Sequence, residues 1–131
     1  MRPLPIFFAA LTLCAGKGLA NPPLSEVPVV REGLIAVALA YEIGDKCRDL
    51  DARLFRGIAF LERLRGEARR LGYSNDEIDA FIDDDAASDR LEAEARARLR
   101  AMGAVEGRGE TYCAVGRAEI QRGSQVGQLL R

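Results

Sequence analysis

The chain has 131 residues, of which 48% are hydrophobic and 30% charged, and its 19 basic and 20 acidic residues nearly cancel. This balance argues against nucleic acid or an anionic lipid surface as the main partner. Since the chain has no histidine, the Ser–His and Cys–His nucleophile pairs and the commonest metal ligand are excluded. We expect no cofactor, and an enzyme would have to use carboxylates alone.

The first twenty residues have the pattern of an export signal. Arg2 supplies a positive charge, residues 6–15 form an almost unbroken apolar run, and residues 18–20 (Gly-Leu-Ala) place small side chains at a cleavage site. The run is shorter than the roughly 20 residues that cross a bilayer. We therefore predict a signal peptide over residues 1–20 and a mature chain from Asn21. The protein would be periplasmic or secreted, without membrane insertion after cleavage.

Apolar periodicity then predicts an extended, Pro-containing lead over residues 21–28 and one helical domain over residues 29–131. The first helix spans residues 29–45 and carries apolar residues on two faces, so we expect it to be buried on most sides. The second spans residues 50–71 and has one apolar stripe opposite its arginines, with Gly72 as C-cap. The stripe comprises Leu50, Leu54, Ile58, Leu61, Leu64, Ala68 and Leu71.

The third predicted helix begins at a capping box at Ser74 and runs to Gly103. Its apolar stripe is interrupted over residues 83–88, which leaves open whether it is kinked there. The fourth begins near Glu110 and bends at Gly123, and strand-like alternation is missing throughout. The predicted fold class is therefore all-α: a small four-helix up-down bundle stapled by one disulfide and preceded by a signal peptide.

Three cysteines are present. Cys14 lies inside the predicted signal, and processing as a lipoprotein would need a small residue before it, where the chain has Leu13. The other two, Cys47 and Cys113, would remain in an oxidising compartment, where cysteine pairs persist as bridges. We predict one disulfide between them. A redox pair is the alternative, although redox thiols usually lie close together in the sequence.

Small residues recur at helical spacing on both sides of the predicted bridge, which suggests a close seam between the first and fourth helices. With antiparallel helices and the bridge setting the register, we expect four facing pairs: Gly44 with Gly116, Ala40 with Ile120, Val37 with Gly123, and Gly33 with Gly127. Each mid-helix glycine costs about 1 kcal/mol against alanine, and backbones about 8 Å apart would explain it. A partly frayed fourth helix is the alternative.

Charge is uneven along the mature chain. Residues 48–70 hold seven basic and four acidic side chains, whereas residues 76–94 hold nine acidic and one basic. We expect adjacent antiparallel helices to pair these opposite fields. Calcium binding is the alternative for the run Asp83 to Asp85. However, an EF-hand loop needs glycine at its sixth position, and counting from Asp83 places Ser88 there.

The bridge would also gather polar side chains from the first and fourth helices. These are Tyr41, Glu42, Tyr112, Arg117 and Glu119. We interpret them as a polar cluster in which Glu42 pairs with Arg117 near the core and satisfies the tyrosine hydroxyls. A catalytic site is the weaker interpretation, because the chain also lacks the tryptophan that a sugar platform would use. We expect no catalytic, cofactor-binding or metal-ligating residue.

A set of motifs extends along the mature chain: Arg31-Glu32-Gly33-Leu34, Ala40-Tyr41-Glu42-Ile43, Cys47, Gly72-Tyr73-Ser74, Glu77-Ile78-Asp79-Ala80-Phe81-Ile82, Asp89-Arg90-Leu91, and Tyr112-Cys113 with Gly116-Arg117-Ala118-Glu119-Ile120. Together they resemble a family of small exported alphaproteobacterial proteins of unknown function. The resemblance implies a periplasmic helical protein with one cysteine pair and no assigned activity. A looser likeness, through Tyr112-Cys113 and Gly116, is to small helical periplasmic immunity proteins.

Three functions follow as hypotheses. The first is a non-enzymatic periplasmic binding or interaction protein, whose partner is another envelope protein or an incoming toxin. The second is a carboxylate-dependent hydrolase of envelope polymers, which needs two carboxylates at catalytic separation and one raised pKa. The third is an acid-responsive periplasmic chaperone, in which neutralising the carboxylates of residues 76–94 loosens the bundle. The first is favoured, and the sequence does not identify the partner.

Overall fold

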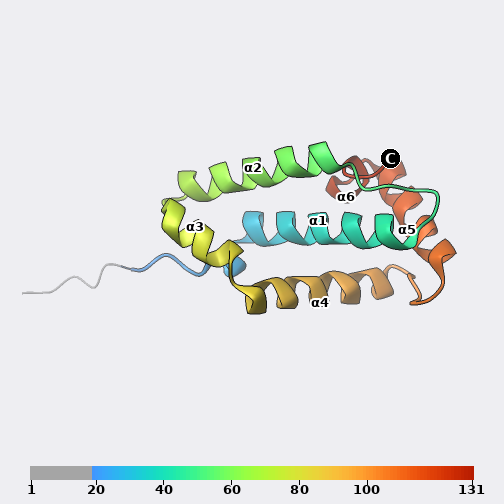
Figure 1. Cartoon of the computed structure of the whole chain (residues 1–131), viewed down its shortest axis with the longest axis horizontal. Helices are drawn as coiled ribbons and strands as arrows, with labels where there is room; N and C mark the ends of the chain where they lie inside the picture. The colour runs from blue at the N-terminus through green and yellow to red at the C-terminus, as the bar shows by residue number, and fades with distance from the viewer. Residues whose placement is uncertain (1–18) are drawn as a thin grey trace, which may run out of the picture.

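The computed structural model describes residues 19–131, so the predicted signal peptide lies almost entirely outside the described residues. The elements are a 3-10 helix Leu24–Glu26 and helices α1 Pro28–Lys46, α2 Leu54–Arg70, α3 Asn75–Ile82, α4 Asp85–Ala101, α5 Gly109–Arg122 and α6 Gln125–Gln128 (Figure 1). Residues 19–131 contain two isolated β-bridges and no strand. The all-α class is confirmed, whereas the helices number six instead of four.

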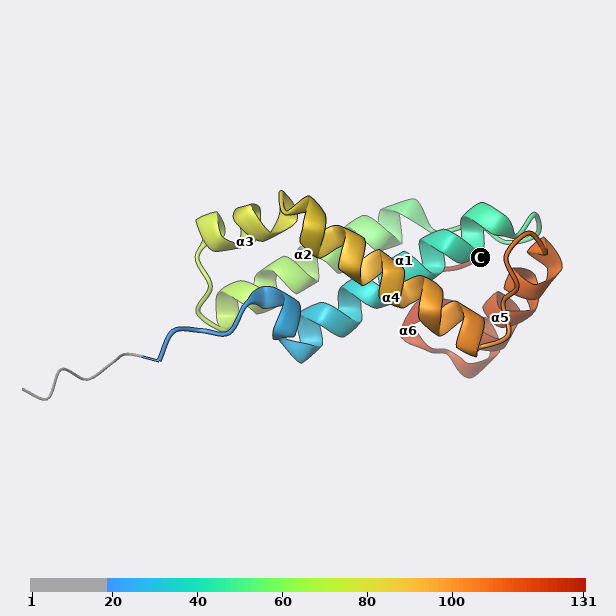
Figure 2. The same cartoon turned by 90° about the horizontal axis from the view of Figure 1, so that it is seen from below.

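α1 is the central helix of the fold. α2 and α4 lie on either side of it, α2 running against its direction and α4 with it (Figure 1), and α4 crosses it at an angle when seen from below (Figure 2). α5 and α6 pack on its C-terminal half. As predicted, α1 is buried on several sides, and Ile35 and Ile43 are fully buried. Because α2 and α4 have little contact with each other, the side of α1 between them is left without a covering helix.

The predicted third helix is divided in two at Asp83 and Asp84. α3 starts at the predicted capping box at Ser74 and ends at Ile82. Asp84 then caps α4, since its side chain accepts a hydrogen bond of 3.0 Å from the backbone N–H of Ala87. Short acidic side chains compete with helical hydrogen bonding in this way. The interruption seen in the sequence is therefore a break between two helices.

α2 begins at Leu54, later than predicted, and buries only part of the predicted stripe. Its buried residues are Leu64 and Ala68, which belong to the stripe, and Phe60, which does not. Leu54, Ile58 and Leu61 are 68%, 49% and 37% exposed. The buried face is therefore shifted around the helix toward Phe60, a larger apolar side chain.

The predicted glycine register is wrong. A β-carbon at Gly44 would lie 2.7 Å from the backbone nitrogen of Ala52, so Gly44 faces the α1–α2 loop. A β-carbon at Gly116 would lie 2.5 Å from Leu50 Cδ1 and 2.8 Å from Ile43 Cγ2. Both glycines therefore permit close approach, but to other partners than each other.

The remaining predicted pairs of the seam also fail. Gly33 approaches the side chain of Leu64 on α2, while Gly127 lies against the backbone of Glu119. Gly123 ends α5 in the left-handed region with φ 63°, and Ile120 is 39% exposed. The physical reason is that α5 ends at Arg122 and folds back through α6, so it cannot follow α1 along its length.

Gly116 still provides a stability prediction. Leucine there must displace the fully buried Ile43 and should lower the free energy of unfolding by about 1 to 3 kcal/mol, as overpacking typically does. Gln121→Leu is the control, because Gln121 is exposed on the same helix. Urea denaturation of both variants makes the comparison. Equal losses would show that the space around Gly116 is not restrictive.

Candidate functional site

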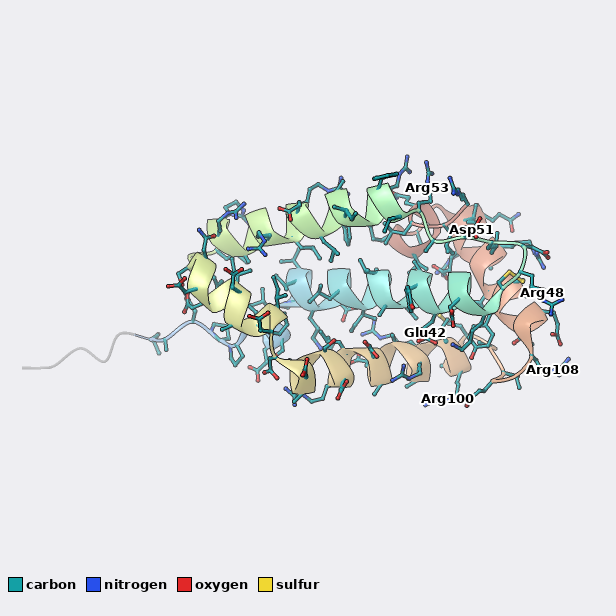
Figure 3. All side chains as sticks on the ribbon, in the orientation of Figure 1. Glu42, Arg48, Asp51, Arg53, Arg100 and Arg108 are labelled. Carbon is teal, nitrogen blue, oxygen red and sulfur yellow. A yellow bond between two sulfur atoms is a disulfide. The ribbon has the colours of Figure 1, made fainter. Side chains whose placement is uncertain are left out.

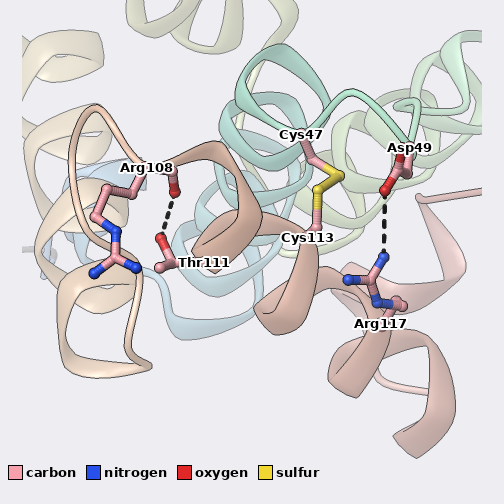
Figure 4. Close-up of a disulfide and its surroundings, with 6 residues drawn as sticks. All are labelled: Cys47, Asp49, Arg108, Thr111, Cys113 and Arg117. Atoms are coloured by element: carbon pink, nitrogen blue, oxygen red, sulfur yellow. Dashed lines mark hydrogen bonds and ion pairs between the residues drawn. A yellow bond between two sulfur atoms is a disulfide. The ribbon is translucent and has the colours of Figure 1, made fainter.

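The Cys47–Cys113 disulfide is present and ties the C-terminal end of α1 to α5 (Figure 4). Its α-carbons are 5.0 Å apart, and both cysteines are buried. On one side of the bridge the Arg117 guanidinium lies 3.7 Å from the Asp49 carboxylate. The bridge thus fixes the loop after α1 against the start of the C-terminal helices.

The predicted polar cluster is distributed over separate places. Glu42 does not pair with Arg117; it accepts from Lys46 Nζ at 2.9 Å and from Arg96 at 3.4 Å. Figure 3 shows Glu42 on the side of α1 near α4. The hydrogen bond that Lys46 donates to Glu42 is the main reason that the pKa of Lys46 is raised. Lys46 Nζ in turn lies 6.0 Å from the ring centre of the buried Tyr112.

Glu119 is buried at the corner between α5 and α6. Its carboxylate accepts hydrogen bonds from Arg122 and from the hydroxyl of Ser124. Burial acts to raise the pKa of Glu119, but these hydrogen bonds outweigh it, and the pKa lies below its ordinary value. Ser124 also caps α6 through Gly127. Glu119 therefore acts as a structural acceptor that holds the corner.

An open apolar groove of about 570 Å³ lies along α1 between α2 on one side and α3 and α4 on the other. Its floor comes from α1, with Leu34, Val37, Ala38 and Tyr41. Apolar residues of the flanking helices form the walls: Leu61, Leu64 and Ala68 of α2, Ile78, Phe81 and Ile82 of α3, and Leu91 of α4. We call this feature the α1 groove. Its volume is in the range of ligand and partner sites.

The α1 groove is bordered by a few charged side chains. Glu42, Glu62 and Glu92 line it together with one arginine, Arg65, which is bound to Asp79 at 2.9 Å. Tyr41 is 64% exposed at the end of the groove nearest the disulfide. Glu42 and Glu92 are both paired with Arg96, so the groove offers an apolar floor with a border of mostly compensated charge. Such a surface can hold an apolar face of a partner.

The other edge between α1 and α4 is closed by an ion network. Arg98 binds Glu32 at 2.6 and 2.9 Å and Glu94 at 2.7 Å, and Arg31 binds both glutamates. The hydrogen bonds from Arg98 are the largest cause of the lowered pKa of Glu32 and of Glu94, with burial opposing them. The network joins the two helices on the side away from the α1 groove.

This network predicts a pH dependence. Carboxylates with a lowered pKa stabilise the fold above their ordinary pKa of 4.5, and that stabilisation is lost as the pH falls through the folded value. Arg98→Gln should lower the melting temperature at pH 7, and the difference from the wild type should shrink well below pH 4.5. Circular dichroism at both pH values measures this. An equal difference at both would mean that the ion pairs do not contribute.

The carboxylates with a displaced pKa are all shifted in one direction. Among residues 19–131, those with a displaced pKa are Glu32, Glu67, Glu94, Glu110 and Glu119, and each is lowered. A general acid needs the opposite shift. The described part of the chain has no group of three or more side chains placed to hold a metal ion. In the run considered for calcium, Asp84 caps α4.

The α1 groove was not predicted from the sequence. The predicted helices over residues 50–71 and from Ser74 to Gly103 are expected to be neighbours that pair their charges. In the structure α2 and α4 flank α1 instead and leave its floor open. One signal was available: the first helix has apolar residues on more faces than its predicted neighbours could cover.

No helix within residues 19–131 is long and apolar enough to span a membrane.

The chain belongs to a family of unknown function, DUF5333, whose model matches residues 22–131. The match covers all the helices of the fold. No curated protein and no solved structure matches the chain. The match confirms that the chain belongs to a family of unknown function, and the structure confirms the expected helical fold with one disulfide.

Proposed function

We propose that this member of the family is an exported, non-enzymatic interaction protein that holds an amphipathic helix of a protein partner in the α1 groove. The observation that carries the proposal is the open apolar groove between α2 and α4. α1, α2 and α4 occupy three positions of a helix bundle. The position over α1 between α2 and α4 is not filled by a helix of residues 19–131. An amphipathic helix fits such a groove because its apolar residues recur along one side.

The composition of the groove supports a polypeptide partner. Its floor extends along α1 from Val30 to Tyr41, which is about 16 Å at the helical rise of 1.5 Å per residue. That length equals about three turns of a partner helix. Beyond the floor, the exposed Leu54 and Ile58 continue the apolar surface along α2.

Ala38→Arg tests the groove. Ala38 lies half-buried on the floor, and arginine keeps helix propensity while filling the groove with a charged side chain. We expect the wild-type protein to retain a polypeptide partner from the cell envelope of its host and Ala38→Arg to lose it. Ile120→Glu, exposed on α5 away from the groove, should retain it. Equal retention by all three would contradict the proposal.

Export is the second part of the proposal. The apolar run of residues 6–15 and the cleavage pattern at residues 18–20 support it, and the family match begins at residue 22, directly after the expected cleavage. A disulfide is also typical of an oxidising compartment. Mass spectrometry of the protein from its host should give an N-terminus at Asn21 without an acyl group. An intact N-terminus or a lipidated cysteine would contradict it.

A further inference from the structure

We propose that the corner between α5 and α6 is an acid-sensitive latch, in which protonation of Glu119 releases residues 124–131 while the rest of the fold stays in place. The inference goes beyond the proposed function and concerns another part of the molecule. It starts from burial: among residues 19–131, Glu119 is the one charged residue that is buried, at 4% exposure. A buried carboxylate depends on the hydrogen bonds that satisfy its charge. We call Glu119, Arg122 and Ser124 the α5–α6 latch.

The Glu119 carboxylate fixes the first residue of the segment that would be released. The hydroxyl of Ser124 donates to this carboxylate and, at 3.3 Å, to the backbone carbonyl of Glu119. The hydroxyl oxygen in turn accepts from the backbone N–H of Gly127 at 3.0 Å and so caps α6. Loss of the negative charge therefore weakens the bond that orients the cap, because charge-assisted hydrogen bonds are about twice as strong as neutral ones.

One cation acts on the buried carboxylate. Arg122, three residues further along α5, donates a hydrogen bond to Glu119 from an otherwise exposed side chain. Residues 124–130 carry no ionisable side chain, and within residues 19–131 no charged side chain of another element contributes to the pKa shift of Glu119. The charge balance of the corner therefore depends on Glu119 and Arg122 alone.

The latch is closed at neutral pH. Burial acts to raise the pKa of Glu119, and the hydrogen bonds from Arg122 and Ser124 outweigh it and hold the pKa below its ordinary value of 4.5. A carboxylate of this kind stabilises the fold above its ordinary pKa, and the stabilisation is lost as the pH falls through the folded value. Release is therefore expected well below pH 4.5.

The segment has a hinge before it and a fixed helix behind the hinge. Gly123 ends α5 in the left-handed region, with φ 63°. The Cys47–Cys113 disulfide ties α5 to the end of α1 whether or not α6 is in place. Three backbone hydrogen bonds of 2.8 to 3.0 Å join residues 129–131 to residues 51–53, so these bonds open with the latch. Figure 1 shows α6 and the C-terminus beside α5, near the start of α2.

Release uncovers an apolar surface near the disulfide. The buried side chains that the segment carries are Val126, Leu129 and Leu130, which belong to the main core. At Gly116 a β-carbon would meet Leu130 as well as Leu50 and Ile43, so Leu130 packs over these two residues. Opening exposes both sides of this contact, and contiguous exposed apolar surfaces mark interaction sites.

Hydrogen exchange of single amides, measured by NMR, tests the latch. Glu119→Gln removes the charge and nearly keeps the size of the side chain. At pH 7 we expect the hydrogen-bonded amides of residues 127–131 to exchange about 10-fold faster or more than in the wild type, the change that losing one charge-assisted hydrogen bond gives, while amides of α1 keep their protection. Glu110→Gln is the matched control. Glu110 is exposed on the same helix and bound to Arg108, and its substitution should leave residues 127–131 unchanged.

The wild type at low pH gives the second measurement, which does not depend on how the variant folds. Exchange rates are divided by the intrinsic rate at each pH. Well below pH 4.5, residues 127–131 should lose protection before α1 does. The latch is overturned if Glu119→Gln protects residues 127–131 as well as the wild type does, or if these residues lose protection at low pH only together with α1.

Discussion

Replacing both bridging cysteines with alanine should lower the free energy of unfolding by about 4 kcal/mol. The bridge joins residues 66 apart in the sequence, and in the chain-entropy model a loop of this size restricts the unfolded state by about that amount. The structure adds a local reason, because the bridge is the covalent link between the end of α1 and α5. Guanidinium denaturation of the oxidised protein and of the double variant measures the difference.

Reduction of the wild type provides the control for this prediction. Cys47 and Cys113 are both buried, so the alanine variant also loses some packing, whereas reduction keeps the sulfur atoms. Both should therefore be destabilised by loss of the cross-link, and the double variant should lose somewhat more, by the packing of the two sulfur atoms. A loss below about 1 kcal/mol in both would mean that the loop is already restricted in the unfolded state.

Gly127→Ala should be the most damaging single methyl group that can be added to this fold. A β-carbon there would lie 2.1 Å from the carbonyl oxygen of Glu119 and 2.6 Å from the backbone nitrogen of Ile120. Backbone atoms cannot rotate away as a side-chain end can, so α6 must leave its place on α5. We expect a loss of about 3 kcal/mol, the upper end of overpacking costs, measured by thermal and urea unfolding.

Gly66→Ala is the matched control for Gly127→Ala. Gly66 lies inside α2, and a β-carbon there meets no atom within 4 Å. The same substitution should therefore stabilise the protein by about 1 kcal/mol through helix propensity. The opposite signs of two Gly→Ala changes separate close backbone contact from propensity. A gain at both positions would contradict the packing of α6, and a loss at both would contradict the open surroundings of Gly66.

The local signals in the sequence predicted the helices well, because capping and periodicity are properties of neighbouring residues. The capping box at Ser74 is present, α1 spans one residue more at each end than predicted, and the bend expected at Gly123 is the left-handed end of α5. The disulfide also formed as predicted. The pairing could be predicted without knowledge of the packing, because two cysteines remain once Cys14 is assigned to the predicted signal peptide.

The contacts between helices were not predictable in the same way. The register of the glycines assumed that α5 follows α1 along its length, but Gly116 packs on Ile43 and Leu50 while Gly44 packs on the loop at Ala52. Helical spacing shows that small residues share a face and does not show which element lies opposite that face. The α1 groove was missed for the same reason, since it depends on α2 and α4 standing apart.

If the α1 groove holds a helix, photo-crosslinking from inside the groove detects that helix most directly. A benzophenone amino acid replaces Tyr41, which lines the groove and is 64% exposed, and in a separate variant it replaces Ile120 on α5. We predict that irradiation joins the Tyr41 variant to a helical segment of a polypeptide partner, identified by mass spectrometry, while the Ile120 variant gives no such product. No adduct from the Tyr41 position, or the same adducts from both positions, would contradict the account.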